Sequence, residues 1–351
     1  MSKGPAGIGF VGCAFSPASA EGGSKPHSHG RRREVVVKGN RVKTVDIHAH
    51  CAVPAAMAIL GQKAEKAELL MSDTTARIAA MDEQGIDVAA LSINPYWYHA
   101  GRDAAAELIR IQNEALAEIC ATTPDRFVAF ATVAWQHPEL AAEQVRHAAK
   151  KLGLRGVSVG CSVEGEELAD PKYHPVWAAC EDLDLLVFMH PQGTKEIHAT
   201  GRLSGSGLLT NTIGNPLETT IALSHLIFEG TLDRFPGLKI CAAHGGGYLP
   251  SYANRSDAVC RTFPDRVGPL PKKKPTSYLK DGQLYFDTIV FTPEALRHLI
   301  AETGPDKIMI GTDYPFPWTS TEVDLVLSTP GLTDDDRIAI LGGTAARLLG
   351  L

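Results

Sequence analysis

Five polar side chains that can bind a metal ion follow four separate apolar stretches of this sequence. His48 and His50 end the first stretch, and residues two apart in an extended strand point to the same face. His190, His244 and Asp313 end the other three stretches. Imidazole nitrogens and carboxylate oxygens suit Zn²⁺, and they also bind Mn²⁺, Fe²⁺ or Co²⁺. The pattern therefore indicates one metal centre built from four distant segments.

Such a centre is catalytic if one coordination position stays open to water or substrate. Water bound there has a pKa near ~7 and provides hydroxide at neutral pH. The cation can instead act as a Lewis acid on a carboxylate or carbonyl oxygen. A single histidine after a strand is more often structural than functional, but the joint placement of these residues favours a functional site. The donor types leave the two chemistries open.

The segments that must position these residues alternate between strand-like and helix-like patterns. Nearly continuous apolar runs predict strands buried on both faces, as in a parallel sheet covered by helices. The predicted strands, some with the turn that follows, cover residues 42–50, 87–93, 127–133, 155–160, 185–191, 238–247, 284–287 and 307–315. The predicted helices cover residues 73–84, 103–121, 138–152, 175–183, 216–229, 249–262, 293–302 and 334–349.

Eight such alternations predict an α/β protein with a single (β/α)8 barrel, a fold of about 250 residues to which insertions are common. Active sites of these barrels lie at the C-terminal ends of the strands, which is where all five polar residues fall. Residues 41–351 form the predicted barrel. Residues 1–40 are rich in Gly, Ser, Pro and Ala and predict an irregular extension.

Composition excludes several classes of protein. Of the 351 residues, 44% are hydrophobic and 21% are charged, and the net charge of −6 offers no basic surface for nucleic acid. No apolar stretch approaches the ~18 residues that span a bilayer. The seven cysteines are scattered without a Cys-x-x-Cys pair, which favours a reducing cytoplasm over a disulfide framework. A soluble enzyme acting on a small molecule is the expectation.

Two further residues near predicted strand ends are candidates for contact with a substrate. Asp287 follows the seventh strand, where a carboxylate can orient a metal-ligand histidine or contact the substrate. Trp97 lies with Tyr96 and Tyr98 after the second strand. Three aromatic side chains at that position line the mouth of the barrel or form a packing lid. Both alternatives stay open for each residue.

Longer motifs extend this pattern along most of the chain. They are DIHAH at 46–50, RI at 77–78, MD at 81–82, GI at 85–86, PDRF at 124–127, HP at 190–191, ETTIA at 218–222, HGGG at 244–247 and GTDYPFP at 311–317. With these motifs the chain resembles the amidohydrolase superfamily. The resemblance is to the branch that includes 2-amino-3-carboxymuconate-6-semialdehyde decarboxylase and related aromatic-acid decarboxylases.

The resemblance implies a metal-dependent hydrolase type of barrel and assigns roles within it. It implies that His48, His50, His190 and Asp313 bind one Zn²⁺ or similar ion. His244 is then the acid/base residue beside the metal-bound water. The resemblance further implies that Arg255, on the helix after the Gly-rich turn, reaches the active site of a neighbouring subunit. That arrangement requires a homodimer.

The leading hypothesis is non-oxidative decarboxylation of an aromatic or unsaturated carboxylic acid that bears an ortho hydroxyl, amino or keto group, as in the catabolism of aromatic compounds. His244 would move a proton to the carbon that carries the carboxylate, and Asp313 could share that proton. The alternatives are a metal-dependent hydrolase or hydratase acting on a lactone, amide or unsaturated acid, and a binding protein with a structural zinc.

The sequence departs from this branch at two places that concern the substrate. Residues 64–70 contain no arginine, where the muconate-semialdehyde enzyme has one for the substrate carboxylate. Gln192 follows His190-Pro191, where that enzyme has a tryptophan. These departures argue against the muconate semialdehyde as substrate and leave the predicted metal centre unchanged.

Overall fold

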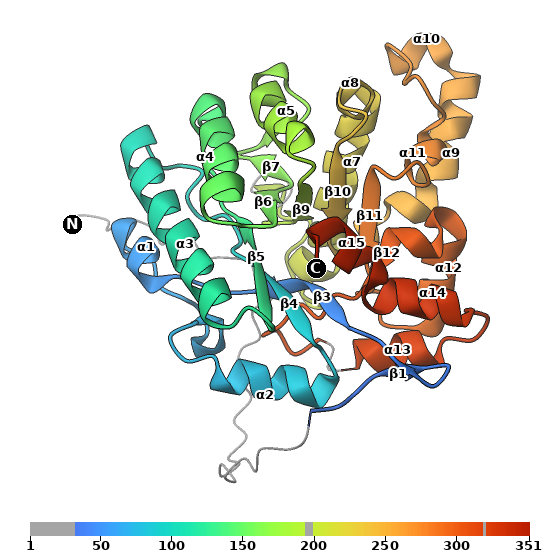
Figure 1. The fold of residues 1–351 in the computed structure, drawn as a ribbon. Coiled ribbons are helices and arrows are strands. Elements are labelled where there is room, and N and C mark those ends of the chain that lie inside the picture. The colour runs from blue at the N-terminus through green and yellow to red at the C-terminus, as the bar shows by residue number, and fades with distance from the viewer. Residues whose placement is uncertain (1–31, 194–198, 319–320) are drawn as a thin grey trace.

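A parallel sheet curled into a barrel forms the centre of the molecule (Figure 1). The computed structural model describes residues 32–193, 199–318 and 321–351. Eight strands lie side by side in chain order, and each pairs in parallel with the next. They are β3 (Val45–His50), β4 (Val88–Ser92), β5 (Phe127–Ala131), β6 (Gly156–Gly160), β9 (Leu186–His190), β10 (Lys239–Ala242), β11 (Leu284–Asp287) and β12 (Ile308–Met309).

The segment that follows β12 closes the barrel against β3. The amide of Ile47 donates to the carbonyl of Ile310 at 2.8 Å, and the amide of Asp313 donates to the carbonyl of His48 at 2.8 Å. The amide of His50 then donates to the carbonyl of Tyr314 at 2.7 Å. The predicted (β/α)8 barrel is therefore confirmed. Its eighth strand is shorter than the apolar run had indicated, and Asp313 stands in the connection beyond it.

Helices cover the outside of the barrel, as the alternating pattern predicted (Figure 1). Those that follow the strands are α2 (Thr75–Gln84), α3 (Arg102–Thr122), α4 (Pro138–Lys151), α5 (His174–Asp182), α7 (Asn215–Phe228), α9 (Leu249–Thr262) and α12 (Pro293–Thr303). In α4, for example, Pro138 occupies the first turn, and Leu140, Val145 and Ala148 are buried on one side. Two lysines end that helix, where positive charge is favourable.

Several short elements were not predicted. They are the helices α1 (Pro54–Ile59), α8 (Thr231–Arg234), α10 (Pro264–Val267), α11 (Pro275–Tyr278) and α13 (Glu322–Ser328), and the hairpin strands β7 (Ser162–Val163) and β8 (Glu166–Glu167). The predicted C-terminal helix is present as α14 (Asp334–Ile338) and α15 (Thr344–Leu349), with a π-helical turn at Ala339–Gly343 between them. These pieces are too short to show a clear period in the sequence.

The floor of the barrel, at the N-terminal ends of the strands, is apolar. Val45 and Ile47 of β3 belong to an inner cluster together with Phe130 and Phe188, whose rings stack 5.4 Å apart. Ala345, Leu348 and Leu349 of α15 join the same cluster. Gly342, just before α15, packs so closely that a Cβ there would lie 2.0 Å from the carbonyl oxygen of Lys43. The C-terminal helix therefore seals the floor.

The end of the predicted irregular extension is ordered. β1 (Val36–Val37) and β2 (Asn40–Arg41) form an antiparallel hairpin, so the boundary predicted at residue 40 cuts through this hairpin. Val35 and Val37 are buried, and apolar burial of this kind attaches the hairpin to the barrel. Residues 1–31 of the extension lie outside the described residues. Within the described ranges, no helix is long and apolar enough to cross a membrane.

Candidate metal centre

Strand β3 carries His48 and His50 to the mouth of the barrel. All six residues of the strand are buried, and its pairing with β4 shifts in register between Asp46 and Ala49. Asp46 supports this bend, because its Oδ1 accepts hydrogen bonds from the amides of His48 and Thr312, both at 3.0 Å. The two Nε2 atoms of His48 and His50 lie 2.9 Å apart. Both imidazoles therefore reach the same point.

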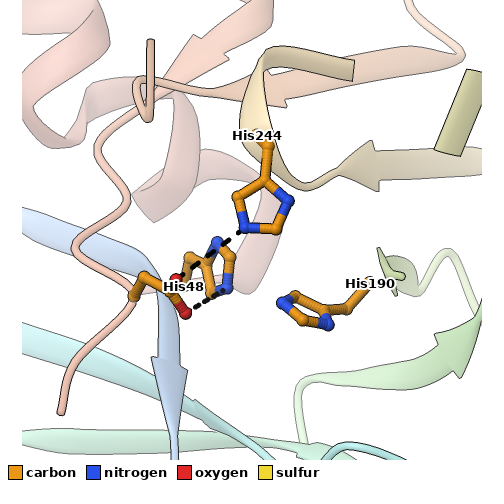
Figure 2. A group of neighbouring side chains, drawn as sticks. His48, His190 and His244 are labelled. Carbon is orange, nitrogen blue, oxygen red and sulfur yellow. Dashed lines mark ion pairs between the residues drawn. The ribbon is translucent and has the colours of Figure 1, made fainter. Parts of the chain in front are cut away.

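Three other segments bring His190, His244 and Asp313 to that point. Figure 2 shows the rings of His190 and His244 beside that of His48. His190 is the last residue of β9, and the centroid of its ring lies 4.7 Å from that of His50 and 5.1 Å from that of His244. His48, His190, His244 and Asp313 each offer one donor atom within 4.8 Å of the others. The structure thus brings together all the residues that the sequence analysis had assigned to the centre.

Two of these residues adopt a backbone conformation that is unusual for side chains with a Cβ. His244 has φ 56° and Asp313 has φ 57°, and such left-handed conformations cost on the order of 1–3 kcal/mol for residues other than glycine. The hydrogen bond from the Asp313 amide to His48 holds one of them in place. Gly311 allows the backbone just before Asp313 to lie close to Asp287, since a Cβ at Gly311 would lie 2.8 Å from the Asp287 Cβ. The surrounding fold maintains both conformations.

Burial and charge set the protonation of the cluster. Burial lowers the pKa of His50 to about 4 and holds the pKa of His190 well below its usual value. Burial also opposes a charged His48, but Asp313 and Asp287 outweigh it and raise the pKa of His48 to about 10. For Asp313, burial is outweighed by His48 and the other imidazoles, which hold the pKa of the carboxyl well below its usual range. At neutral pH, Asp313 is therefore anionic and His50 and His190 are neutral, the forms that bind metals.

The donor atoms fit a divalent cation. Asp313 Oδ1 lies 2.8 Å from His50 Nε2 and 3.2 Å from His48 Nε2, but neither carboxylate oxygen has a hydrogen-bond partner. Both ring nitrogens of His190 are buried and equally without a partner. A buried polar atom left unpaired costs about 1–3 kcal/mol. A cation bound by His50, His190, Asp313 and a His48 that releases its proton on binding would satisfy these atoms, and such a donor set suits Zn²⁺ or Mn²⁺.

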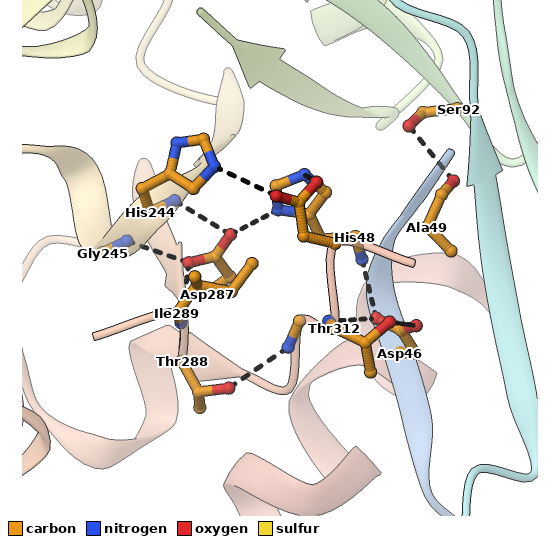
Figure 3. Close-up of polar contacts among 12 residues, drawn as sticks. Asp46, His48, Ala49, Ser92, His244, Gly245, Asp287, Thr288, Ile289 and Thr312 are labelled. Carbon is orange, nitrogen blue, oxygen red and sulfur yellow. Dashed lines mark hydrogen bonds and ion pairs between the residues drawn. The ribbon is translucent and has the colours of Figure 1, made fainter. Parts of the chain in front are cut away.

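Asp287 hydrogen-bonds to His48 and to the backbone of His244 (Figure 3). Its Oδ2 accepts from His48 Nδ1 at 2.7 Å and from the amide of His244 at 2.9 Å. Its Oδ1 accepts from the amides of Gly245 and Ile289 at 2.9 and 3.1 Å. The bond to Nδ1 leaves His48 Nε2 facing the other donors. Of the two roles that the sequence left open for Asp287, the structure supports orientation of a ligand histidine; both oxygens are already used, so contact with a substrate is not supported.

Comparison with known proteins identifies the family. Residues 45–351 match the family model described as amidohydrolase. The chain belongs to the amidohydrolase family. It is 31% identical over 310 residues to 2-amino-3-carboxymuconate-6-semialdehyde decarboxylase from Dictyostelium discoideum, which covers 88% of this chain and 85% of that protein. The branch that the motifs had indicated is thereby confirmed.

Two other similar proteins are decarboxylases according to their names. Gamma-resorcylate decarboxylase from Rhodococcus jostii is 30% identical over 287 residues, covering 78% of this chain and 87% of that protein. The crystal structure of a dihydroxybenzoic acid decarboxylase from Polaromonas sp. JS666, with bound manganese and the inhibitor 2-nitroresorcinol, superposes with a TM-score of 0.78. It shares 28% identity and covers 88% of this chain and 97% of its own.

A cavity of about 470 Å³ opens beside the donor cluster of this amidohydrolase. His244 and Asp313 border it on one side, and Phe291 and Trp318 contribute aromatic walls. The volume lies within the range of small-molecule sites, about 300–1,000 Å³. A second cavity, of about 70 Å³, borders His50 and is lined in part by Lys63, Asn94, Tyr96 and Phe316. The larger cavity has the size for an aromatic acid.

The two remaining predicted residues lie away from the larger cavity. Trp97 is fully buried and its Nε1 donates to the carbonyl of Val133 at 3.0 Å; it lines neither cavity, and a contact between Trp97 and substrate finds no support here. Arg255 is exposed on α9 of this chain. The walls of the cavity, such as Phe291, were missed because no sequence pattern distinguishes such residues from ordinary loop residues.

Proposed function

We propose that this amidohydrolase is a metal-dependent decarboxylase that removes CO2 from a hydroxylated aromatic acid without oxidation. The observation that carries the proposal is the convergence of four histidines and Asp313 beside a cavity of about 470 Å³. The two curated relatives compared are decarboxylases of acids, which favours decarboxylation over the hydrolase and hydratase alternatives. The shared fold with the manganese-containing Polaromonas enzyme supports a metal in the reaction.

His48, His50, His190 and Asp313 are the proposed metal ligands. They are the most buried members of the cluster, with side chains at most 6% exposed. When bound, the cation would supply positive charge that orients the carboxylate of the substrate and offsets its negative charge. Zn²⁺ and Mn²⁺ both suit this donor set. Asp287 keeps His48 in the orientation that the ligand set requires.

His244 is the proposed proton donor. Its side chain is 15% exposed, against 0–2% for His48, His50 and Asp313, and it borders the larger cavity. A proton from His244 would move to the ring carbon that carries the carboxylate. The bond between this carbon and the carboxylate then breaks, its electron pair returns to the ring, and CO2 leaves. Asp313 Oδ2, 3.8 Å from His244 Nε2, can share that proton.

The deciding experiment is CO2 release by zinc-loaded or manganese-loaded protein from a panel of hydroxybenzoates. His244→Ala is expected to abolish turnover while the protein keeps its metal, because His244 lies outside the proposed ligand set. His298→Ala is the matched control, since His298 is exposed on α12 and contacts Ser251 rather than the cluster. Absence of CO2 from every acid, or full activity of His244→Ala, would contradict the proposal.

We also propose a homodimer formed through α9. Tyr252, Val259 and Phe263 are 64%, 36% and 47% exposed. The spacing of seven residues places Tyr252 and Val259 on one face of α9, and Phe263 directly follows the end of this helix. Arg255 lies near this face, so a second copy packed there would receive Arg255 from its partner. Phe263→Asp is expected to yield monomers in sedimentation velocity, whereas Val36→Asp, at a 51% exposed residue of the hairpin, is expected to leave the dimer intact. A monomeric wild-type protein would contradict this.

The proposed compartment is the cytoplasm. The cysteines of the described residues are free thiols: Cys51, Cys120, Cys161, Cys180, Cys241 and Cys260. Free thiols of this kind persist in a reducing compartment.

A further inference from the structure

The wall of the larger cavity contains a buried polar atom that the proposed reaction does not yet use. Asn215, the first residue of α7, lines this cavity together with His244 and Asp313. It is 4% exposed, and its side-chain oxygen Oδ1 is buried without a hydrogen-bond partner. An unpaired amide oxygen in such a position costs about 1–3 kcal/mol of stability. A hydrogen-bond donor on a bound ligand would remove this cost by pairing with Asn215 Oδ1.

Other polar groups of the same wall already have partners within the protein. The hydroxyl of Thr212 donates to the carbonyl of Gly207 at 3.2 Å. The hydroxyl of Ser251 lies 3.1 Å from His298 Nε2, and that of Tyr248 donates to the carbonyl of Thr212 at 3.4 Å. Asn215 therefore differs from these neighbours in offering an acceptor that no protein group uses.

The backbone holds Asn215 in a fixed position relative to His244. The carbonyl of Asn215 accepts from the Thr219 hydroxyl at 3.2 Å. The next carbonyl, that of Pro216, accepts from the Thr220 hydroxyl, which in turn accepts from the amide of Tyr248 at 2.8 Å. Gly247 packs against the same carbonyl so closely that a Cβ would lie 2.1 Å from it. The start of α7 and the Gly-rich turn after His244 are thus one rigid unit, as recognition requires.

We infer that Asn215 determines substrate specificity by accepting a hydrogen bond from a hydroxyl or amino group on the substrate ring. The inference rests on the proposed function for the identity of the ligand as an aromatic acid. In the amide orientation of this structure the unpaired atom is the carbonyl oxygen, which accepts and cannot donate. A keto, methoxy or second carboxylate group at that ring position would therefore leave this oxygen unpaired unless the amide turned its NH2 group toward it. Of the predicted substrates with an ortho hydroxyl, amino or keto group, this inference favours those with a hydroxyl or amino group, because these groups donate a hydrogen bond.

The test compares a hydroxybenzoate with its methoxy analogue, substituted at the same ring position. Sites that hydrogen-bond a substrate hydroxyl reject analogues that lack it by factors up to about 10⁴–10⁵, and we expect the wild-type kcat/KM ratio for at least one position to be about 10²-fold or more. Asn215→Leu and Asn215→Ala are expected to reduce that ratio to below about 10-fold. Ser224→Ala, at a residue of α7 outside the cavity wall whose hydroxyl donates to the carbonyl of Thr220, is expected to keep the ratio.

Two further readouts separate the possible failures. Asn215→Leu should melt at or above the wild-type temperature, because an apolar group replaces an unpaired polar one; Asn215→Ala serves if the larger side chain prevents folding. Calorimetric binding of the same pairs to zinc-loaded protein measures discrimination without turnover. Discrimination lost in the variants, with no CO2 from the wild type, would sink the proposed function and keep the inference. CO2 release with an unchanged ratio in both variants would overturn the inference alone.

Discussion

The floor and the mouth of the barrel differ in the kind of atoms that they bury. At the floor, Val45, Phe130 and Phe188 fill the interior with apolar surface, and α15 closes it. At the mouth, His190 and Asp313 are also buried, yet their side-chain polar atoms lack hydrogen-bond partners. Burial of apolar surface stabilises a fold, whereas burial of unpaired polar atoms opposes it. The floor thus stabilises the folded protein, whereas the mouth destabilises it by burying unpaired donor atoms that are available to a ligand.

A second contrast lies within the mouth. Asp287 ends β11, Asp313 follows the neighbouring strand β12, and both are buried. Asp287 accepts four hydrogen bonds from protein groups, whereas the Asp313 oxygens have no partner in hydrogen-bond geometry and lie against the imidazoles of His48 and His50. The same side chain is therefore a positioning group in one place and a candidate ligand in the other. Hydrogen-bond partners, and not residue type, distinguish the two.

The largest expected effect is at Asp313. Asp313→Asn removes the anionic donor, and since metal charge stabilises a reaction by several kcal/mol, kcat/KM should fall by about 10³-fold or more. The metal content of the purified protein should fall as well, as measured by elemental analysis. Asp306→Asn, at an acid just before β12, is the control. If Asp313→Asn kept both its metal and its activity, Asp313 would not be a metal ligand, and its proposed difference from Asp287 would be wrong.

Phe130 tests the floor. Phe130→Ala should lower the free energy of unfolding by about 3–5 kcal/mol, because it removes a fully buried ring and leaves a cavity. Urea unfolding of the metal-free protein measures this loss. The metal affinity of the folded protein should stay close to that of the wild type. A loss of affinity comparable to that of Asp313→Asn would show that floor and mouth are not separable.

Substitution of Glu322 measures how much a buried, partly unpaired carboxyl group near the mouth lowers the free energy of unfolding. It begins α13, is 3% exposed, and its Oε2 has no partner. Burial raises the pKa of Glu322 from 4.5 to about 8, against an opposing bond from Thr288. Because the folded protein then binds the proton more tightly than the unfolded chain, the stability that this group contributes is complete below pH 4.5 and is lost as the pH rises through about 8.

The wild-type free energy of unfolding should therefore fall by on the order of 3 kcal/mol between pH 5 and pH 8 through this group. Glu322→Gln should remove that slope and should stabilise the protein at pH 8 more than at pH 5. Chemical denaturation at both pH values checks this. Glu302→Gln, at a half-buried residue of α12, is the control. Equal slopes in wild type and Glu322→Gln would contradict the prediction.

The smallest effect is expected at Asp287. Asp287→Asn keeps the shape of the side chain but weakens its hold on His48 Nδ1, and loss of such a partner typically reduces metal affinity by about 10–100-fold. Competition with a chromophoric chelator measures this affinity. The variant should still bind metal, unlike Asp313→Asn. An affinity equal to that of the wild type would show that Asp287 serves only the backbone of the Gly-rich turn.

Much of the fold could be predicted because it depends on patterns that are local in the sequence. Apolar runs such as that ending at His190, separated by helical segments, indicated the barrel and the end at which its site lies. The position of Asp313 was less well predicted: the apolar run suggested a strand reaching this residue, but β12 ends at Met309. Pairing with β3 replaces the strand there, and such pairing cannot be read from a run of apolar residues.

The sequence by itself determined the types of donor atoms, the strands that carry them and the family to which the chain belongs. Only the tertiary structure decided which atoms are already satisfied. The bond between His48 and Asp287 joins residues 239 positions apart, and the unpaired oxygen of Asn215 is recognised only when all its neighbours are in place. Likewise Trp97, as aromatic as Trp318, lies in the core whereas Trp318 lines the cavity. Residue type sets what a side chain can do, but long-range packing determines which partners it meets.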